Sequence, residues 1–381
     1  MNPASRIYLD YSATRPVRPE VRSAVEPILF GSPQDGSFGN ASSVHWAGQA
    51  ARRHLESARG TVARILQRSP GEVVFTSGGT EADNLALAGL LRSVRHPRLL
   101  LSAVEHPAVL APAEAWRNSG VDVVLIPPLS SGALDLESLQ KALETRTTLV
   151  SVMAVNNETG IVHDIPTVRA LAAEAGCPLH VDAVQAAGRL PLPSWDADLV
   201  ALSGHKLGGL PGTGVLAVRA SLGLSPTQLG GPQERGHRAG TEFVAGAVSF
   251  ARALELAEQE REVETRRQAK LRDRLDDALK QLPGCRVLDG TDRVASVTCA
   301  VFDAVDGEAL LQALDLEGVA VSSGSACSSG SLEPSHVLMA MGLSPEHALS
   351  ALRFSLGSET EEKDIDVVCR LLPQLLETVR S

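Results

Sequence analysis

Three features are scarce or missing in this sequence: aromatic residues, paired cysteines and long apolar runs. Phe, Trp and Tyr make up only 3% of the 381 residues, so the core has to be built from aliphatic side chains. No two of the five cysteines form a CxxC pair, so we expect neither a metal site nor a disulfide framework. No apolar run approaches the ~20 residues that a membrane span needs, and the N-terminus lacks the apolar segment of a secretory signal.

Long runs of basic residues are also missing. The chain has 45 acidic and 35 basic residues and a formal net charge of −10. Because nucleic-acid binding depends on positive charge, we expect neither a nucleic-acid partner nor a membrane partner. Unpaired thiols are typical of a reducing compartment, and we expect a cytoplasmic protein.

Short apolar runs that alternate with helix-like segments are the dominant pattern. Runs rich in Val and Leu suit strands covered on both faces, and the segments between them suit crossover helices. The expected strands cover residues 73–75, 99–101, 121–126, 149–152, 178–181, 199–202 and 215–218, and the expected helices cover residues 81–91, 107–118, 136–143 and 165–175. This alternation predicts an α/β fold with a mostly parallel sheet and helices on both faces.

The alternation stops near residue 241, where a second type of organisation begins. A long helical pattern covers residues 244–282 and ends at a Pro-Gly pair. Strand-like runs follow at residues 294–302, 319–322 and 352–356, with helical runs at residues 307–314, 345–352 and 361–379. We therefore expect a large domain at residues 15–250 and a smaller α+β domain formed by residues 1–14 and 251–381.

The sequence Ser-Gly-His-Lys at residues 203–206 directly follows the expected strand 199–202. Open α/β sheets bind ligands at the carboxyl ends of their strands. A lysine that is partly desolvated there has a lowered pKa and a nucleophilic amine. Lys206 is therefore a candidate catalytic amine, and Ser203 and His205 are candidate phosphate donors. The alternative is a surface lysine in a glycine-rich loop.

Residues 76–80 form a glycine turn between an expected strand and an expected helix. The free N–H groups at a helix start make a natural anion site, to which Gly79 and Thr80 would contribute. The alternative is an ordinary turn in which Thr80 caps the helix.

Three further polar groups follow other expected strands at the same sheet edge. Asp182 ends a buried strand, where a carboxylate needs a cationic partner such as a pyridine nitrogen, and Gln185 lies three residues later. His106 could stack on a flat ring and move protons, and Asn157 could hold a carboxylate or a ring oxygen. The alternatives are a helix cap for Asp182, a structural histidine, and a simple turn at Asn157.

A segment rich in serine and glycine, residues 322–331, surrounds Cys327. A cysteine on such a mobile loop suits a nucleophile that has to move; the alternative is a linker with an incidental thiol. Arg353 could clamp a substrate carboxylate or could be a surface ion-pair residue. Taken together, the Lys206 amine, the anion site at residues 76–80, the Asp182 carboxylate as partner of a ring nitrogen and the His106 imidazole fit pyridoxal phosphate as the cofactor.

The sequence resembles the cysteine desulfurases, which are class V, fold-type I pyridoxal-phosphate enzymes. The resemblance runs from residues 8–14 (Tyr-Leu-Asp-Tyr-Ser-Ala-Thr) to residues 353–357 (Arg-Phe-Ser-Leu-Gly). Its most specific segments are residues 203–206 and residues 323–327 (Ser-Gly-Ser-Ala-Cys), the second of which looks like the longer loop of the group I desulfurases.

The resemblance implies a role for each candidate residue. Lys206 would hold the cofactor as a Schiff base and carry the α-proton, and His106 would stack on the ring as an acid/base. Asp182 would pair with the ring nitrogen and Gln185 with the ring oxygen. The phosphate would be held by Gly79, Thr80, Ser203 and His205, and the substrate carboxylate by Asn157, also part of the cofactor site, and Arg353.

The resemblance further implies a reaction and its partners. L-cysteine would be converted to L-alanine, and Cys327 would keep the sulfur as a persulfide. An acceptor protein, such as an iron–sulfur scaffold or a thiolation carrier for tRNA or a cofactor, would then take the sulfur. Thr241 would reach the phosphate of a neighbouring subunit, which implies a homodimer.

Two other interpretations stay open at this point. The chain could be a selenocysteine lyase or another class V enzyme such as a transaminase, although transamination needs no thiol like that of Cys327. It could also be a non-catalytic partner protein that has kept the fold.

Overall fold

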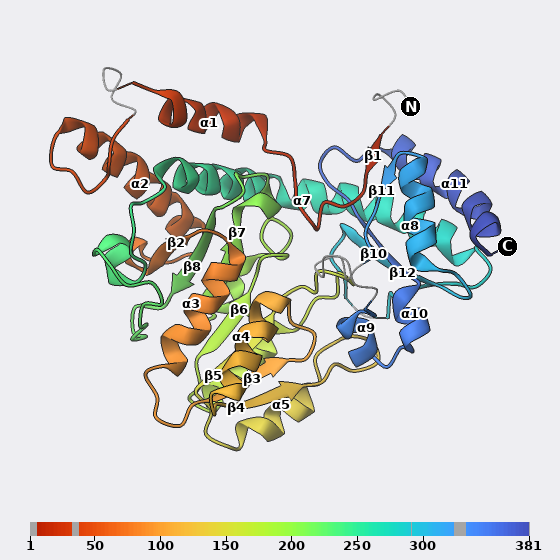
Figure 1. Ribbon diagram of the computed structural model, residues 1–381, viewed down its shortest axis with the longest axis horizontal. Helices are drawn as coiled ribbons and strands as arrows, with labels where there is room; N and C mark the ends of the chain where they lie inside the picture. The colour runs from red at the N-terminus through yellow and green to blue at the C-terminus, as the bar shows by residue number, and fades with distance from the viewer. Residues whose placement is uncertain (1–5, 33–37, 291, 324–332, 381) are drawn as a thin grey trace.

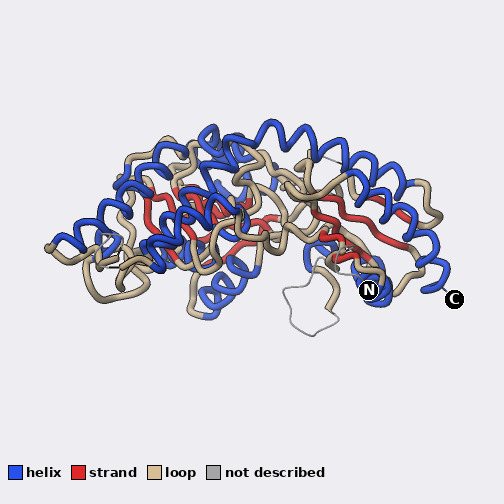
Figure 2. The backbone as a smooth tube through the Cα atoms, turned by 90° about the horizontal axis from the view of Figure 1, so that it is seen from above, coloured by secondary structure: helices blue, strands red, loops and turns tan. Residues whose placement is uncertain are grey.

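The computed structural model describes residues 6–32, 38–290, 292–323 and 333–380, so Cys327 lies outside the described residues. Two groups of strands lie side by side, and one long helix, α7 (Val244–Lys280), runs along both of them (Figures 1 and 2). The arrangement is elongated, with the larger sheet in one lobe and the smaller sheets in the other.

The larger lobe contains a seven-stranded sheet in the order β2-β8-β7-β6-β5-β3-β4. Its strands are β2 (Val73–Thr76), β3 (Arg98–Ser102), β4 (Asp122–Ile126), β5 (Leu149–Met153), β6 (Leu179–Asp182), β7 (Leu199–Ser203) and β8 (Gly214–Val218). Neighbouring strands are parallel except β8, which is antiparallel to both β2 and β7. The prediction of an α/β fold with a mostly parallel sheet is confirmed, and each expected strand matches an observed one to within one residue at either end.

Helices cover both faces of this sheet, because alternate side chains of a strand point to opposite faces. Leu99 and Leu101 of β3 pack in one apolar cluster with α3 (Gly79–Leu91) and α4 (Pro107–Asn118). Leu100, between them, packs on the other face with α2 (Trp46–Ile65), α5 (Leu136–Leu143), α6 (Ile165–Glu174) and the first half of α7. This two-sided burial explains the near-continuous apolar runs of the sequence.

The smaller lobe contains two small sheets. Its strands are β9 (Cys285–Val287), β10 (Val297–Phe302) and β12 (Ala351–Ser355), which are antiparallel, and β1 (Ile7–Tyr8) and β11 (Val319–Ala320), which form a parallel pair. A separate apolar cluster around Phe302 and Phe354 packs these strands against α8 (Gly307–Leu316), α11 (Glu362–Arg380) and the second half of α7. A fourth cluster joins the lobes, since Val104 and Ile161 pack with Val337 of α9 (His336–Ala340).

The division into domains stays a prediction. The expected boundary after residue 250 falls within α7, whose residues contribute to two different cores. Residues of α7 from Val244 to Ala257 belong to the core of the large sheet, and those from Leu271 to Leu279 belong to the core of the smaller lobe.

Some helices were not predicted, and one predicted helix extends too far at its C-terminal end. Helix α1 (Pro19–Phe30) buries only Val21 and Val25, and α2 buries mainly alanine and glycine, so neither buries a stripe of large apolar side chains. Expected helix 345–352 ends earlier, as α10 (Pro345–Leu349), because Ala351 already pairs with β10. Within the described ranges, no helix has the length and apolar character needed to cross a membrane.

Candidate active site

The carboxyl ends of β2, β3, β5, β6 and β7 open into one cavity of about 510 Å³. These strands run in the same direction, so the residues that follow them meet at one edge of the sheet. The predicted residues that line this cavity are Gly79, Thr80, His106, Asn157, Asp182, Gln185, Ser203, His205, Lys206 and Arg353. The structure therefore brings together groups that are widely separated in the sequence.

Lys206 is presented by a turn immediately after β7. The short 3₁₀ helix η5 (Gly204–Leu207) ends at Gly208, whose φ of +83° lies in the left-handed region that favours glycine. The Lys206 Nζ donates to the carbonyl oxygens of Ser12 and Ala13, at 2.6 and 2.7 Å. The segment that follows β1 thereby determines where the amine lies in the cavity wall.

The start of α3 forms a cup of backbone N–H groups. The first turn of a helix has N–H groups without intrahelical acceptors, and it carries partial positive charge that attracts phosphate. A Cβ atom on Gly79 would lie 2.8 Å from Cγ2 of Val184 and 3.5 Å from Cβ of Ser203. Glycine at this position therefore lets the turn pack closely against the ends of β6 and β7.

Asp182 is the last residue of β6 and is 5% exposed. Its Oδ1 accepts a hydrogen bond from the Val184 N–H at 2.9 Å. Burial, together with the neighbouring Asp83, raises the pKa of Asp182 to about 7, although the Val184 N–H, His180 and Lys206 act in the opposite direction. A cationic ring nitrogen in the cavity would stabilise this buried carboxylate.

His106 caps the start of α4. Its Nδ1 accepts a hydrogen bond from the Ala108 N–H at 3.0 Å, so the proton of the neutral ring is on Nε2. Burial lowers the pKa of His106 to about 4, and the neighbouring Lys206 and His336 contribute to this shift. The imidazole that faces the cavity is therefore neutral near pH 7.

Arg353 of β12 reaches the cavity from the smaller lobe. Its Nη2 donates to Asp10 Oδ1 at 2.6 Å, and its Nη1 donates to the Asn157 carbonyl oxygen at 2.8 Å. The buried Nε has no hydrogen-bond partner among the described residues. Arg353 is thus held rigidly from both lobes and still has a donor to offer.

Two other predicted residues make contacts within the protein. The Gln185 Nε2 donates to the Ser12 carbonyl oxygen at 2.9 Å, and its Oε1 accepts from Arg189 Nη1 at 2.5 Å. Since an amide nitrogen has two hydrogens, Nε2 still has one for a ring oxygen. His205 Nδ1 is 3.1 Å from the Thr14 hydroxyl.

Sequence reasoning missed two buried acids beside this cavity, Asp83 and Glu105. Burial raises the pKa of Asp83 to about 8 and raises the pKa of Glu105 well above its usual value. Asp83 Oδ1 lies 3.4 Å from Nε2 of the fully buried His180. The sequence did offer one signal for Glu105, which lies next to His106 and follows an apolar strand. Only the packing of the chain shows that both acids are buried.

Thr241 does not line the cavity. It is exposed and lies at the end of a loop whose Glu234 and Arg235 have positive φ values of 46° and 56°. Two ion pairs hold this loop: Arg238 with Glu81 of the cup, at 2.9 Å, and Glu234 with Arg59 of α2, at 2.7 Å.

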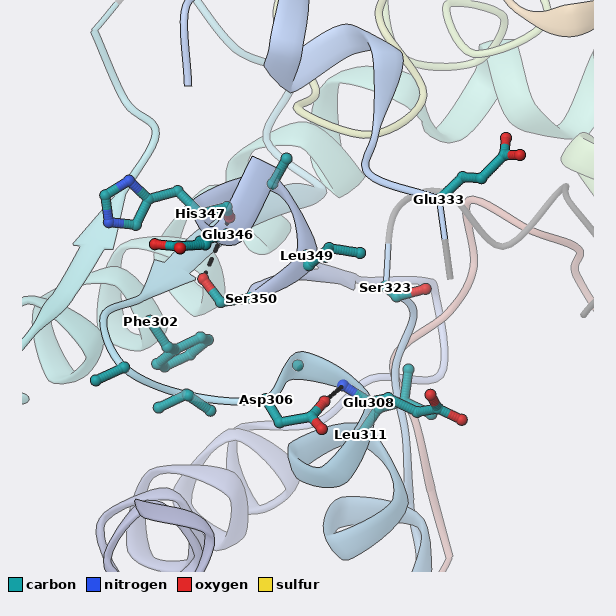
Figure 3. Close-up of a pocket in the computed structure, with 14 residues that line it drawn as sticks. Phe302, Asp306, Glu308, Leu311, Ser323, Glu333, Glu346, His347, Leu349 and Ser350 are labelled. Atoms are coloured by element: carbon teal, nitrogen blue, oxygen red, sulfur yellow. Dashed lines mark hydrogen bonds between the residues drawn. The ribbon is translucent and has the colours of Figure 1, made fainter. Parts of the chain in front are cut away.

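A second cavity, of about 720 Å³, lies in the smaller lobe. Ser323 and Glu333, the described residues on either side of the Cys327 segment, both line it (Figure 3). The apolar side chains of Phe302 and Leu311 lie inside, and exposed carboxylates surround them: Asp306, Glu308, Glu333 and Glu346.

The residues at the sheet edge fit pyridoxal phosphate. A lysine amine, a helix N-terminus and a buried carboxylate at one edge of the sheet match the aldehyde, the phosphate and the ring nitrogen of this cofactor. The two-lobed α/β fold and this cavity define the class of enzymes that bind pyridoxal phosphate at the edge of a parallel sheet.

Comparisons with known proteins lead to a narrower assignment. The sequence pattern of the family "Aminotransferase class-V" matches residues 7–368. The cysteine desulfurase of Nostoc sp. (strain PCC 7120) is 41% identical, over 99% of this chain and 94% of that protein, and that of Cereibacter sphaeroides is 42% identical, over 99% and 97%. A solved structure titled "NIFS-LIKE PROTEIN" superposes with a TM-score of 0.90 at 32% identity and covers 98% of this chain and all of that one. The chain belongs to the class-V aminotransferase family and, within it, to the pyridoxal-phosphate-dependent cysteine desulfurases.

Proposed function

We propose that this enzyme converts L-cysteine to L-alanine and leaves the sulfur atom on Cys327 as a persulfide. The observation that supports this best is the single cavity in which Lys206, Asp182, His106 and Arg353 meet. These groups are chemically suited to bind the cofactor, to handle the α-proton and to hold an amino-acid carboxylate.

The cofactor roles follow from the contacts at the sheet edge. The Lys206 amine is the covalent anchor, Asp182 is the partner of the ring nitrogen, and Gln185 is a donor to the ring oxygen. The N–H cup of α3 holds the phosphate, with the side chains of Thr80, Ser203 and His205. When bound, pyridoxal phosphate withdraws electrons from the α-carbon of the amino acid and so acidifies its proton.

Proton handling is assigned to Lys206 and His106. The neutral His106 lines the cavity and carries its proton on Nε2, because its Nδ1 accepts a hydrogen bond from the Ala108 N–H. Because the pKa of His106 is about 4, this imidazole stays neutral over the physiological pH range, so it can stack on a cationic ring without charge repulsion.

Arg353 and Asn157 are assigned to the substrate carboxylate. Asp10 and the Asn157 carbonyl oxygen fix the guanidinium of Arg353 in the lining of the cavity, where we assign it as a donor to the carboxylate. Charge-assisted hydrogen bonds of this kind are stronger than neutral ones, so they favour an amino acid over an uncharged thiol.

The sulfur step requires a thiolate from Cys327. Its sulfur attacks the sulfur atom of the substrate, an S–S bond forms, and the C–S bond breaks with its electron pair going to the β-carbon, which is then protonated to give alanine. The described cysteines are poor alternatives, since burial raises the thiol pKa of Cys177, Cys285 and Cys299 to about 12. Their unpaired thiols also suit a reducing, cytoplasmic environment.

Two variants test the main proposal. Lys206→Ala should abolish the visible absorption of the bound cofactor and all alanine formation. Cys327→Ser should keep the cofactor absorption but lose the protein-bound persulfide. Sulfur release from cysteine that is undiminished in Cys327→Ser would refute the role of Cys327, and equal turnover of selenocysteine by this variant would favour a lyase.

We also propose a homodimer in which Thr241 completes the phosphate site of the other subunit. Thr241 is exposed, yet its loop is tied to the phosphate cup by Arg238 and Glu81, which places the loop near a site it does not itself line. Mixing Lys206→Ala with Thr241→Ala subunits should restore one complete site per mixed dimer. A fully active monomer in sedimentation velocity would contradict this.

The sulfur acceptor is proposed to dock at the second cavity. Its exposed carboxylates, among them Glu308 and Glu346, favour an acceptor protein with a basic surface, such as an iron–sulfur scaffold or a thiolation carrier. Glu308→Lys/Glu346→Lys should slow sulfur transfer to the acceptor while alanine formation with a small reductant stays unchanged. Unchanged transfer would place the docking surface elsewhere.

A further inference from the structure

A third cavity, of about 80 Å³, lies where four distant segments meet beside α7. Residues 15–18, 188–190 and 293–296 converge there on α7 residues 257–268. α7 runs along both lobes at this point (Figures 1 and 2). This cavity shares no lining residue with the cofactor cavity.

Positive charge dominates the lining of this cavity. It contains four arginines, Arg15, Arg18, Arg189 and Arg293, and two carboxylates, Glu260 and Glu264. Both carboxylates already have partners: Glu260 accepts from Arg18 at 2.7 Å, and Glu264 accepts from Arg267 at 2.9 Å. Arg293 pairs with Asp276 at 2.5 Å.

The other two arginines, Arg15 and Arg189, form no ion pair with a described residue. Burial is the main cause that lowers the pKa of Arg15, to about 10, and that of Arg189, well below its usual value. Repulsion from the neighbouring Arg15 adds to the effect on Arg189, followed by repulsion from Arg353. A guanidinium nevertheless keeps its charge in proteins, and the carboxylates of Glu260 and Glu264, already paired with other arginines, offset this charge only in part.

Several donors around this cavity are buried without an acceptor. Within the described part of the chain, these atoms are Arg15 Nε, Arg189 Nε and Nη2, Arg293 Nη1 and Ser296 Oγ. Arg189 is 9% exposed and Ser296 is fully buried. Buried donors that lack acceptors are costly, and charged ones are the most costly. Unsatisfied donors from three separate segments therefore belong to residues that line one cavity.

We propose that this cavity binds a small oxyanion, of the phosphate, sulfate or short-carboxylate class. The planar forks of Arg15 and Arg189 match the oxygen atoms of such an anion, and Ser296 adds a neutral donor. The volume exceeds that required for one water molecule and suits a compact anion. An anion there supplies the acceptor that each buried donor lacks and offsets the repulsion between the two guanidinium groups.

The site is connected to the catalytic lysine by a short chain of hydrogen bonds. Arg189 Nη1 donates to Gln185 Oε1 at 2.5 Å, and Gln185 Nε2 donates to the Ser12 carbonyl oxygen at 2.9 Å. That same oxygen accepts from Lys206 Nζ at 2.6 Å. Anion binding therefore fixes Arg189 and, through it, the wall of the cofactor cavity.

The test is thermal unfolding of the holoenzyme, in which the phosphate cup is filled by its own cofactor. Sodium phosphate, sulfate, acetate and chloride are compared at matched ionic strength. We expect the oxyanions to raise the midpoint with saturation, as specific binding to the folded state requires, and chloride to have a smaller effect. Titration calorimetry with inorganic phosphate should then give a single site per chain.

Two variants and one control connect the effect to this cavity. Arg189→Met should weaken phosphate binding by about tenfold or more, the loss expected for a charge-assisted contact. Ser296→Ala, a smaller change that should preserve folding, should weaken it less. Arg64→Met removes an arginine whose side chain is 64% exposed and should leave the binding unchanged.

Two results would overturn the proposal. One is a wild-type midpoint that does not respond to any oxyanion beyond the effect of chloride. The other is an Arg189→Met variant that responds to phosphate as the wild type does.

Discussion

The buried ion pair between Arg59 and Glu234 provides the sharpest test of the packing around the cofactor site. Arg59 donates to both Glu234 oxygens, at 2.7 and 2.9 Å, and to the Val73 carbonyl oxygen at 2.8 Å. Glu234 also accepts from the Phe75 N–H at 2.9 Å. The pair therefore joins β2, which leads into the phosphate cup, to the loop that presents Thr241.

Replacing Arg59 with methionine keeps most of the side-chain volume but leaves the carboxylate of Glu234 buried without its cation. Both side chains of the pair are 3% exposed. Removal of one partner from a buried pair costs about 3–5 kcal/mol. The pair also holds Glu234 and Arg235 in left-handed backbone conformations that cost about 1–3 kcal/mol each, so loss of the pair should also release the loop.

A double-mutant cycle separates charge burial from lost packing. Arg59→Met/Glu234→Gln removes both charges but keeps an oxygen for the Phe75 N–H, so we expect it to recover at least half of the stability lost in Arg59→Met. Arg64→Met, which breaks an exposed pair with Glu255, is the control and should cost less than about 1 kcal/mol.

The assay is urea unfolding of the holoenzyme followed by circular dichroism, with cofactor release measured in parallel. Arg59→Met should shift the unfolding midpoint strongly and release the cofactor at lower urea concentration than the wild type does. The reasoning would be refuted by a double variant that is as unstable as Arg59→Met, or by an Arg59→Met variant that resembles Arg64→Met.

Three further predictions concern the cofactor site and the pH dependence of stability. Asp182→Asn should lower activity by about 100-fold or more, as expected for loss of a preorganised charge; near-normal turnover would contradict its role. A Cβ on Gly214 would lie 2.5 Å from the Gly78 backbone, so Gly214→Ala should weaken cofactor retention, whereas Gly71→Ala, with open space around it, should not. Burial lowers the pKa of His163 to about 4, so the unfolded state binds a proton on this histidine more readily than the folded state does. The stability that neutral His163 permits is therefore present above pH 6.5 and is lost as the pH falls toward 4. Between neutral pH and pH 5 the loss should be about 2 kcal/mol, and urea unfolding of His163→Leu should show a flatter pH dependence.

Much of the fold was predictable because its strongest signals are local. A strand buried on both faces requires a continuous apolar run, as at Leu99 to Leu101 and at Leu149 to Met153, and these runs located the strands to within one residue. Helix α2 escaped prediction because it packs through small residues such as Ala51 and Gly48. Its contact with the core depends on the neighbouring elements and therefore becomes apparent only in the tertiary structure.

The candidate site was predictable in outline for a related reason. Parallel strands bring their carboxyl ends to one edge, so residues that follow different strands, such as Asp182 and Lys206, had to lie near one another. The partners that tune them were not predictable. Asp83, which raises the pKa of Asp182, and Ser12, which positions Lys206, reach the site from a helix and from a segment that follows the other lobe's first strand.

The sequence by itself determined the class of fold, the edge of the sheet that carries the site and the kinds of side chain found there. Those properties depend on the period of the apolar residues, the spacing of the polar residues after each strand and the residue types, all of which are local features of the sequence. Only the tertiary structure decided which groups are buried and what they contact: the neutral state of His106, the anchoring of Arg353 by Asp10, and the unsatisfied donors of Arg15 and Arg189 among the described residues. Electrostatic energies depend on distance and desolvation, and both are properties of the packed chain.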